Sequence, residues 1–190
     1  MDEGVVRQRL QEVSIQAQDG VDNNGFRRAA VLLLLVNRDG EKEIVFTRRT
    51  DRVETHKGQV SFPGGMAEPG DGTAEATALR EAYEEIGLDA SLVQILGRLP
   101  QMKTVTGWVI TPVVGWSNQQ PELKANADEV ERIFSIPLNW LADQQNFQER
   151  LYTRSDGTQE MVLFYKPFDG ELLWGTTARM VWQFIQALRL

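Results

Sequence analysis

The stretch of sequence that decides the fold runs from Gly64 to Leu88 and reads GGMAEPGDGTAEATALREAYEEIGL. Its second half predicts a helix from Thr73 to Ile86, because Thr73 can cap the first turn and alanines fill the interior. Gly87 then ends the helix in the left-handed conformation that glycine adopts without strain. We therefore expect a capped helix directly after a glycine-rich loop.

Three acids share one face of this helix. At about 100° per residue, Glu84 and Glu85 lie on either side of Glu81. The opposite face, which we expect to be buried, carries Leu79, Ala82, Tyr83 and Ile86. Acids at this spacing also occur on ordinary solvated helices, yet like charges four residues apart cost a helix about 0.2–0.5 kcal/mol. A bound Mg²⁺ or Mn²⁺ would neutralise them, because hard cations take carboxylate oxygens.

The sequence from Gly65 through Leu88 resembles the Nudix box, in which a glycine and a spaced acid precede Arg-Glu-x-x-Glu-Glu-x-Gly-aliphatic. The tail of the box is Arg80 to Leu88, REAYEEIGL, and it matches at each fixed charged and glycine position. One position departs from the box, because the acid expected eight residues before the arginine falls on Gly72. Asp71 stands one residue earlier, and either Asp71 or Glu68 is a candidate for the role of that acid.

The resemblance implies a fold of class α/β (α+β), a Nudix-like α/β/α sandwich with a mixed β-sheet between helices. We expect one domain over residues 1–190, with an N-terminal helix and loop in 1–25 and the Nudix box in 64–88. The irregular alternation of predicted elements also indicates a mixed sheet. Strands are predicted at 29–36, 43–47, 59–62, 92–99, 107–116 and 162–165, an ambiguous short strand at 129–133, and helices at 3–17, 136–141 and 176–190.

By resemblance, the chain would be a metal-dependent pyrophosphohydrolase that acts on a phosphorus-containing anhydride. Such chemistry needs positioning and charge neutralisation more than a covalent nucleophile. Arg80 would orient the acids through charge-assisted hydrogen bonds. The implied ligands of Mg²⁺ or Mn²⁺ are Gly65, Glu81, Glu84 and Glu85, and the implied catalytic residues are Glu84, Glu85, Arg80 and Glu129.

The general base is either a glutamate of the box or an acid from a later loop. Asp128, Glu129 and Glu131 form the best later cluster. We choose Glu129 among them, and the alternative is a solvated acidic turn.

The sequence upstream of the box resembles the coenzyme A pyrophosphatase subgroup of the Nudix family. Residues 46–50 read FTRRT and residues 56–65 read HKGQVSFPGG, which follow the subgroup pattern of Thr-x-Arg, then His-x-Gly-Gln and Phe-Pro-Gly-Gly. Thr50 departs from the serine or alanine that is usual at its position. With similar segments at 128–130, 136–138 and 174–178, the resemblance covers about residues 27–188.

This second resemblance implies cleavage of coenzyme A or its derivatives to adenosine 3′,5′-bisphosphate and 4′-phosphopantetheine. Arginine suits bidentate contact with phosphate, and the candidate substrate-binding residues are Arg48, Arg49, Arg52 and Lys57. A solvated basic loop is the alternative for any single one of them. His56, the one histidine of the sequence, is expected to have a structural hydrogen-bonding role.

The composition of the chain limits the kinds of molecule that the protein is expected to bind. Acidic residues outnumber basic ones by 27 to 20, for a net charge of −7, which disfavours nucleic acid. The absence of cysteine excludes disulfides and thiolate sites and fits a cytoplasmic protein. The longest apolar run, Ala29 to Val36, is too short to cross a membrane, and the N-terminus lacks the pattern of a signal peptide. We expect a small-molecule nucleotide substrate that is coenzyme A-like, no nucleic acid, no membrane, and either a monomer or a homodimer.

Two other functions stay open at this point. The first is a Nudix hydrolase for another nucleoside diphosphate derivative, such as ADP-ribose, a dinucleotide or a nucleoside triphosphate. The second is a catalytically inactive Nudix domain that senses a ligand, which the presence of all three box glutamates disfavours.

Overall fold

The computed structural model describes residues 2–16, 25–51, 58–154 and 157–190. In this part of the chain, eight strands form one mixed sheet and two further strands form a separate hairpin. The helices are α1 (Glu3–Gln16), α2 (Ala74–Ile86), α3 (Leu138–Ala142) and α4 (Gly175–Leu188), with 3₁₀ turns at Ala90–Leu92 and Gln144–Asn146. The strands of the large sheet are β1 (Arg27–Arg38), β2 (Glu41–Arg49), β3 (Val60–Ser61), β4 (Gly64–Met66), β5 (Gln94–Arg98), β6 (Met102–Lys103), β7 (Trp108–Trp116) and β8 (Val130–Pro137), and the hairpin joins β9 (Phe147–Thr153) to β10 (Gln159–Tyr165).

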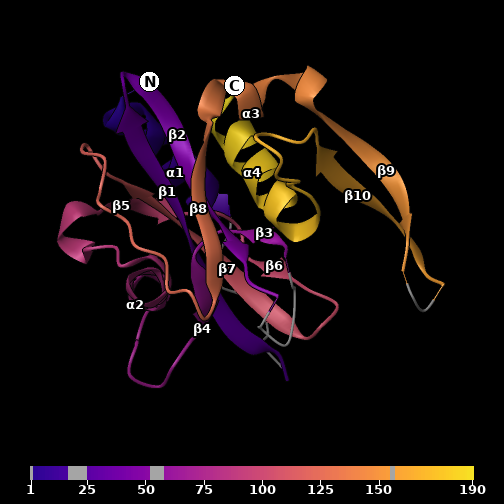
Figure 1. Cartoon of the computed structure of the whole chain (residues 1–190), viewed down its shortest axis with the longest axis horizontal. Helices are drawn as coiled ribbons and strands as arrows, with labels where there is room; N and C mark the ends of the chain where they lie inside the picture. The colour runs from indigo at the N-terminus through magenta and orange to yellow at the C-terminus, as the bar shows by residue number, and fades with distance from the viewer. Residues whose placement is uncertain (1, 17–24, 52–57, 155–156) are drawn as a thin grey trace.

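The sheet lies between helices, as the sequence predicts (Figure 1). In the central strand β1, Leu33 and Leu35 belong to a core shared with α1, α3 and α4. Leu32 and Leu34 belong to a second core shared with α2. Burial on both faces explains why this apolar run forms a strand, because alternate side chains point to opposite sides of a sheet. The predicted α/β/α sandwich is therefore confirmed.

The sheet is mixed because β1 runs parallel to β7 and antiparallel to β2. A turn at Asp39 and Gly40, both with positive φ (51° and 89°), makes the β1–β2 hairpin. Further along, β2 pairs with β3 and β1 pairs with β4. The chain thus crosses from β2 to β1 through Phe62-Pro63 and places Gly64-Gly65 where the two long strands separate.

Several element predictions need correction. The ambiguous segment 129–133 is the long strand β8, which pairs with β2 through Pro137, so the short helix begins at Leu138 rather than at Ile136. Proline is tolerated there because it stands at the end of its strand. The short strands β4 and β6 and the strand β9 were not predicted, since two or three residues give no periodic signal and β9 is polar and exposed. The described helices include none that is long and apolar enough to span a bilayer.

Candidate active site

Helix α2 begins and ends as its sequence predicts. The Thr73 hydroxyl accepts a hydrogen bond from the Ala76 amide at 3.1 Å, and Gly87 adopts φ 64° at the C-terminal end. Its buried side is rotated relative to the predicted one, because the buried residues are Thr77, Ala78, Ala82, Glu85 and Ile86. Tyr83, predicted to be buried, is 66% exposed. Small alanines let the helix pack closely on the sheet, and this orientation buries one of the acids.

Glu85 is that buried acid, with 2% of its surface exposed. One carboxylate oxygen contacts Nη1 of Arg49 at 3.2 Å, and the other accepts a hydrogen bond from the Gly64 amide at 3.2 Å. Burial raises the pKa of Glu85 to about 7, and the negative charges of Glu129 and Glu81 add to the rise, while Arg49 opposes it. Because burial disfavours the ionised form of Glu85, this carboxylate needs a nearby cation to stay charged.

Gly65 lies directly against Glu81. A Cβ atom at Gly65 would stand 2.6 Å from the carboxylate carbon and from both oxygens of Glu81, so only glycine leaves room for this carboxylate. Burial raises the pKa of Glu81, and Arg80, whose Nη2 lies 2.9 Å from Oε1 of Glu81, opposes the rise.

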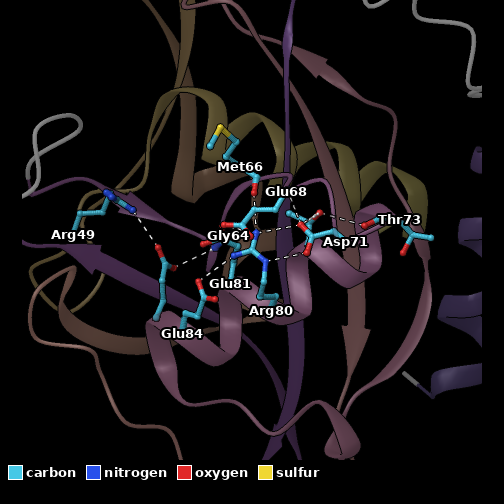
Figure 2. Close-up of polar contacts among 11 residues, drawn as sticks. Arg49, Gly64, Met66, Glu68, Asp71, Thr73, Arg80, Glu81 and Glu84 are labelled. Atoms are coloured by element: carbon cyan, nitrogen blue, oxygen red, sulfur yellow. Dashed lines mark hydrogen bonds and ion pairs between the residues drawn. The ribbon is translucent and has the colours of Figure 1, made fainter.

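Arg80 connects the box helix to the loop before it. Its guanidinium donates to both carboxylate oxygens of Asp71 at 3.0 and 3.2 Å, to the Met66 carbonyl at 2.8 Å and to Glu84 at 3.1 Å (Figure 2). With its contact to Glu81, this arginine touches two box acids through charge-assisted contacts, and its orienting role stays a prediction.

Asp71 also accepts hydrogen bonds from the Thr77 hydroxyl at 2.8 Å and the Glu68 amide at 2.9 Å. The Arg80 hydrogen bond, followed by the Glu68 amide, holds the pKa of Asp71 well below its usual range. Between the two candidates for the displaced box acid, Asp71 makes these contacts, and Glu68 contributes its backbone amide.

Glu129 belongs to a turn that is bonded to α2 and to β2. The Asn126 amide donates to the Glu85 carbonyl, and the Thr50 amide donates to the Glu129 carbonyl, both at 2.9 Å. The charge of Glu129 raises the pKa of both Glu81 and Glu85, so its carboxylate acts on the box acids. Sequence reasoning missed Thr50 and Asn126, although an asparagine just before an acidic turn is a recognisable turn signal.

The predicted substrate-binding residues have different surroundings. Arg49 contacts Glu85, as described, whereas Arg48 points to the other side of β2 and forms ion pairs with Glu131 at 3.2 Å and Glu171 at 3.7 Å. Arg52 and Lys57, like His56, lie outside the described residues.

The donor atoms of this site are of the kind that hard divalent cations bind. Within residues 2–16, 25–51, 58–154 and 157–190, no three acidic or histidine side chains already form a cluster that could hold a metal. The arginines Arg49 and Arg80 instead contact the box glutamates. Yet burial raises the pKa values of Glu81 and Glu85. Gly65 has no side chain and so leaves space beside Glu81. Carboxylate and carbonyl oxygens are the donors that Mg²⁺ and Mn²⁺ prefer.

Comparisons with known proteins identify the family of this chain. The family model of the NUDIX domain matches residues 26–156. An uncharacterized Nudix hydrolase, NudL of Photorhabdus laumondii, is 37% identical over 169 residues, which cover 89% of this chain and 88% of the relative. The protein of the same name from Yersinia pestis is 36% identical over 155 residues, or 82% and 76% of the two chains.

Solved structures support the fold. The Nudix hydrolase RenU of M. smegmatis has a TM-score of 0.53 at 22% identity and covers 63% of this chain and 75% of its own. A MutT/nudix family protein of Enterococcus faecalis has a TM-score of 0.52 at 14% identity and covers 97% and 71%. With the family model, the NudL relatives and the box helix in agreement, this chain belongs to the Nudix family and is a Nudix pyrophosphohydrolase.

Proposed function

We propose that this enzyme hydrolyses the diphosphate bond of coenzyme A or its derivatives, with Mg²⁺ or Mn²⁺, to adenosine 3′,5′-bisphosphate and 4′-phosphopantetheine. The observation that carries the proposal is the contact between Arg49 and Glu85. It joins the Thr-x-Arg segment, which resembles the coenzyme A subgroup, to the most buried acid of the Nudix box.

The two ends of the subgroup-like segment also meet at this arginine. The Arg49 amide donates to the Gln59 carbonyl at 3.0 Å, and the Gly58 amide donates to the Arg49 carbonyl at 3.2 Å. The segment therefore starts and returns beside the box helix, which supports a part for it in substrate recognition. Arg52 and Lys57 remain predicted phosphate contacts. For Arg48, a substrate phosphate would have to compete with its two carboxylate partners.

Nudix hydrolases use divalent metal ions. When bound, such an ion supplies charge neutralisation at the diphosphate and lowers the pKa of a bound water. Its proposed ligands are the side chains of Glu81, Glu84 and Glu85 and the carbonyl of Gly65.

The chain's own residues supply the rest of the mechanism. Arg80 keeps the carboxylates of Glu81 and Glu84 in place through its contacts at 2.9 and 3.1 Å. Arg49 neutralises Glu85 and can contact phosphate. Glu129 takes a proton from the attacking water as general base. The two phosphate groups then separate without a covalent intermediate on the protein.

A product assay tests the proposal. Coenzyme A, ADP-ribose, NADH, diadenosine polyphosphates and nucleoside triphosphates are each incubated with the protein in Mg²⁺ and Mn²⁺, and products are identified by mass. We expect the two halves of coenzyme A. Intact coenzyme A together with cleavage of another compound would show that the substrate assignment is wrong, and cleavage of none would favour an inactive ligand-sensing domain.

The metal role of the box is tested by Glu85→Gln, which keeps the shape of the side chain. We expect turnover to fall by at least about a hundredfold, since charge stabilisation at such a site is worth that much or more. Glu75→Gln is the matched control, because Glu75 lies on the same helix and pairs with Arg98 at 2.6 Å, away from the other acids. Near-normal turnover in Glu85→Gln, or an equal loss in the control, would contradict the assignment.

A further inference from the structure

The turn that carries Glu129 lies between β7 and β8, in a segment without regular secondary structure. Backbone hydrogen bonds fix its start to the end of α2, where the Lys124 amide donates to the Ile86 carbonyl at 2.9 Å. Within the turn, the amides of Glu129 and Val130 donate to the Asn126 carbonyl at 3.0 and 2.8 Å. These contacts shape the turn, and Val130, directly after it, pairs with Arg49 as the first residue of β8.

Thr50 adds a connection from the end of β2 into the turn itself. It follows β2 directly and is 7% exposed. Its amide donates to the Glu129 carbonyl at 2.9 Å, and its hydroxyl donates to the Asp128 carbonyl at 3.1 Å. One residue therefore binds the carbonyl groups on both sides of the Glu129 Cα. Because threonine is branched at Cβ, its χ1 angle is restricted, which limits the directions that the hydroxyl can take.

We propose that Thr50 is a positioning residue that holds the Asp128–Glu129 peptide so that the Glu129 carboxylate faces the box acids. This inference rests on the proposed role of Glu129 as general base. Proton transfer needs a heavy-atom approach of about 2.6–3.2 Å, and a displacement of about 1 Å can cost a hundredfold in rate. The two bonds from Thr50 act on both sides of the residue that must be held that closely.

The position of Thr50 also links two parts of the site. Its neighbour Arg49 contacts Glu85 at 3.2 Å from the same end of β2. The Asn126 amide donates to the backbone carbonyl of that same glutamate. The Thr50 bonds therefore close a ring of contacts from β2 through the turn to α2 and back to β2. Removing the Thr50 hydroxyl loosens this ring at Asp128 without removing any group that touches substrate.

The test uses Thr50→Val, which keeps the branched shape and the amide but loses the hydroxyl, and Thr50→Ser, which restores the hydroxyl. With coenzyme A as substrate, we expect Thr50→Val to lower kcat about tenfold with KM changed less than about twofold. Thr50→Ser is expected to stay within about threefold of the unmodified protein. Ser117→Ala is the matched control, because that buried hydroxyl also donates to a backbone carbonyl, that of Gln119 at 2.8 Å, at the far end of β7.

A double-mutant cycle separates positioning from general loss of stability. In a Glu129→Gln background, Thr50→Val should have no further effect on kcat, because the group that it positions is already gone. An equal loss of kcat in both backgrounds, an unchanged kcat in Thr50→Val, or an equal loss in the Ser117 control would overturn the proposal.

A second measurement does not depend on the substrate. Amide hydrogen exchange of the unliganded protein should become faster over residues 124–130 in Thr50→Val and stay unchanged over residues 74–86. If coenzyme A is not cleaved while another diphosphate is, the substrate proposal fails and the kinetic cycle runs on that compound. Unchanged exchange over 124–130 would overturn the positioning role of Thr50, whatever the substrate.

Discussion

At the scale of single residues, Gly64 and Gly65 share a sequence motif but serve different purposes. A Cβ at Gly64, whose φ is 155°, would collide with the carbonyl oxygen of Ala30 and lie 2.6 Å from Cα of Val31. These are backbone atoms, which cannot move aside cheaply. A Cβ at Gly65 would meet the carboxylate of Glu81, which is the far end of a flexible side chain. Gly64 is therefore needed for the backbone pairing of the fold, and Gly65 is needed for the position of the Glu81 carboxylate in the site.

This difference predicts that two alanine substitutions have different effects, one mainly on stability and the other mainly on the site. We expect Gly64→Ala to lower the free energy of unfolding by about 1–3 kcal/mol, because the backbone pairing of β4 is forced apart. Gly65→Ala should cost less than about 1 kcal/mol, yet lower Mn²⁺ affinity and turnover at least tenfold by displacing Glu81. Urea denaturation and a Mn²⁺ titration measure the two effects. Equal destabilisation by both, with metal affinity intact in Gly65→Ala, would contradict this division of roles.

At the scale of elements, the sequence predicted the box helix well because local signals determine it. Its cap, its end at Gly87 and the shared face of the three acids were all readable from residue types and spacing. The spacing of residue types along the helix could not predict which side of the helix packs on the sheet. Ala78, Ala82 and Ile86 are buried together with Glu85, so the packed side is rotated toward the acids and Tyr83 is left exposed.

The contacts of Glu85 depend on residues distant in the sequence, which explains why they were not predictable. Arg49 is 36 positions away from Glu85, and nothing in the sequence places it opposite a particular acid. The sequence alone therefore suggests substrate phosphate as its partner. Thr50 appeared only as a departure from a subgroup pattern. Its partners Asp128 and Glu129 lie 78 and 79 positions further along the chain, next to the β2–β8 pairing.

The buried position of Glu85 predicts how the metal-free protein responds to pH. Its pKa is raised from 4.5 to about 7 in the folded state, so the folded protein binds more protons than the unfolded chain between these values. Stability from this group is therefore greatest below about pH 4.5 and falls as pH rises to about 7, by on the order of 3 kcal/mol. Metal binding should tighten over the same range, because the ligand must be deprotonated.

Urea denaturation with EDTA at pH 5 and pH 8 measures this effect. Glu85→Gln cannot ionise, so it should lose less stability than the unmodified protein between the two pH values. Carboxyl groups away from Glu85 titrate equally in both proteins and cancel in the comparison. The same pH dependence in both would show that Glu85 is already ionised at pH 5.

At the scale of the whole molecule, the site and the terminal helices α1 and α4 lie on opposite faces of the sheet (Figure 1). Helix α2 covers one face, and α1 and α4 share the core on the other. Val6 and Leu10 of α1 are fully buried there, so the N-terminal helix packs on this chain's own sheet. We propose on this basis that residues 1–190 form one domain.

This separation predicts that α1 contributes to stability without shaping the site. Leu10 is 0% exposed and lies against Gly97 of β5. Leu10→Ala should lower the free energy of unfolding by about 2–5 kcal/mol, because a cavity opens in the core. Val5→Ala, on the same helix but at a residue that is 42% exposed, should change it by less than about 0.5 kcal/mol. Chemical denaturation measures both, and kcat of the folded fraction should be the same in each. If Leu10→Ala costs no more than Val5→Ala, α1 is not part of the core; if it lowers kcat of the folded protein, the two faces are coupled through the sheet.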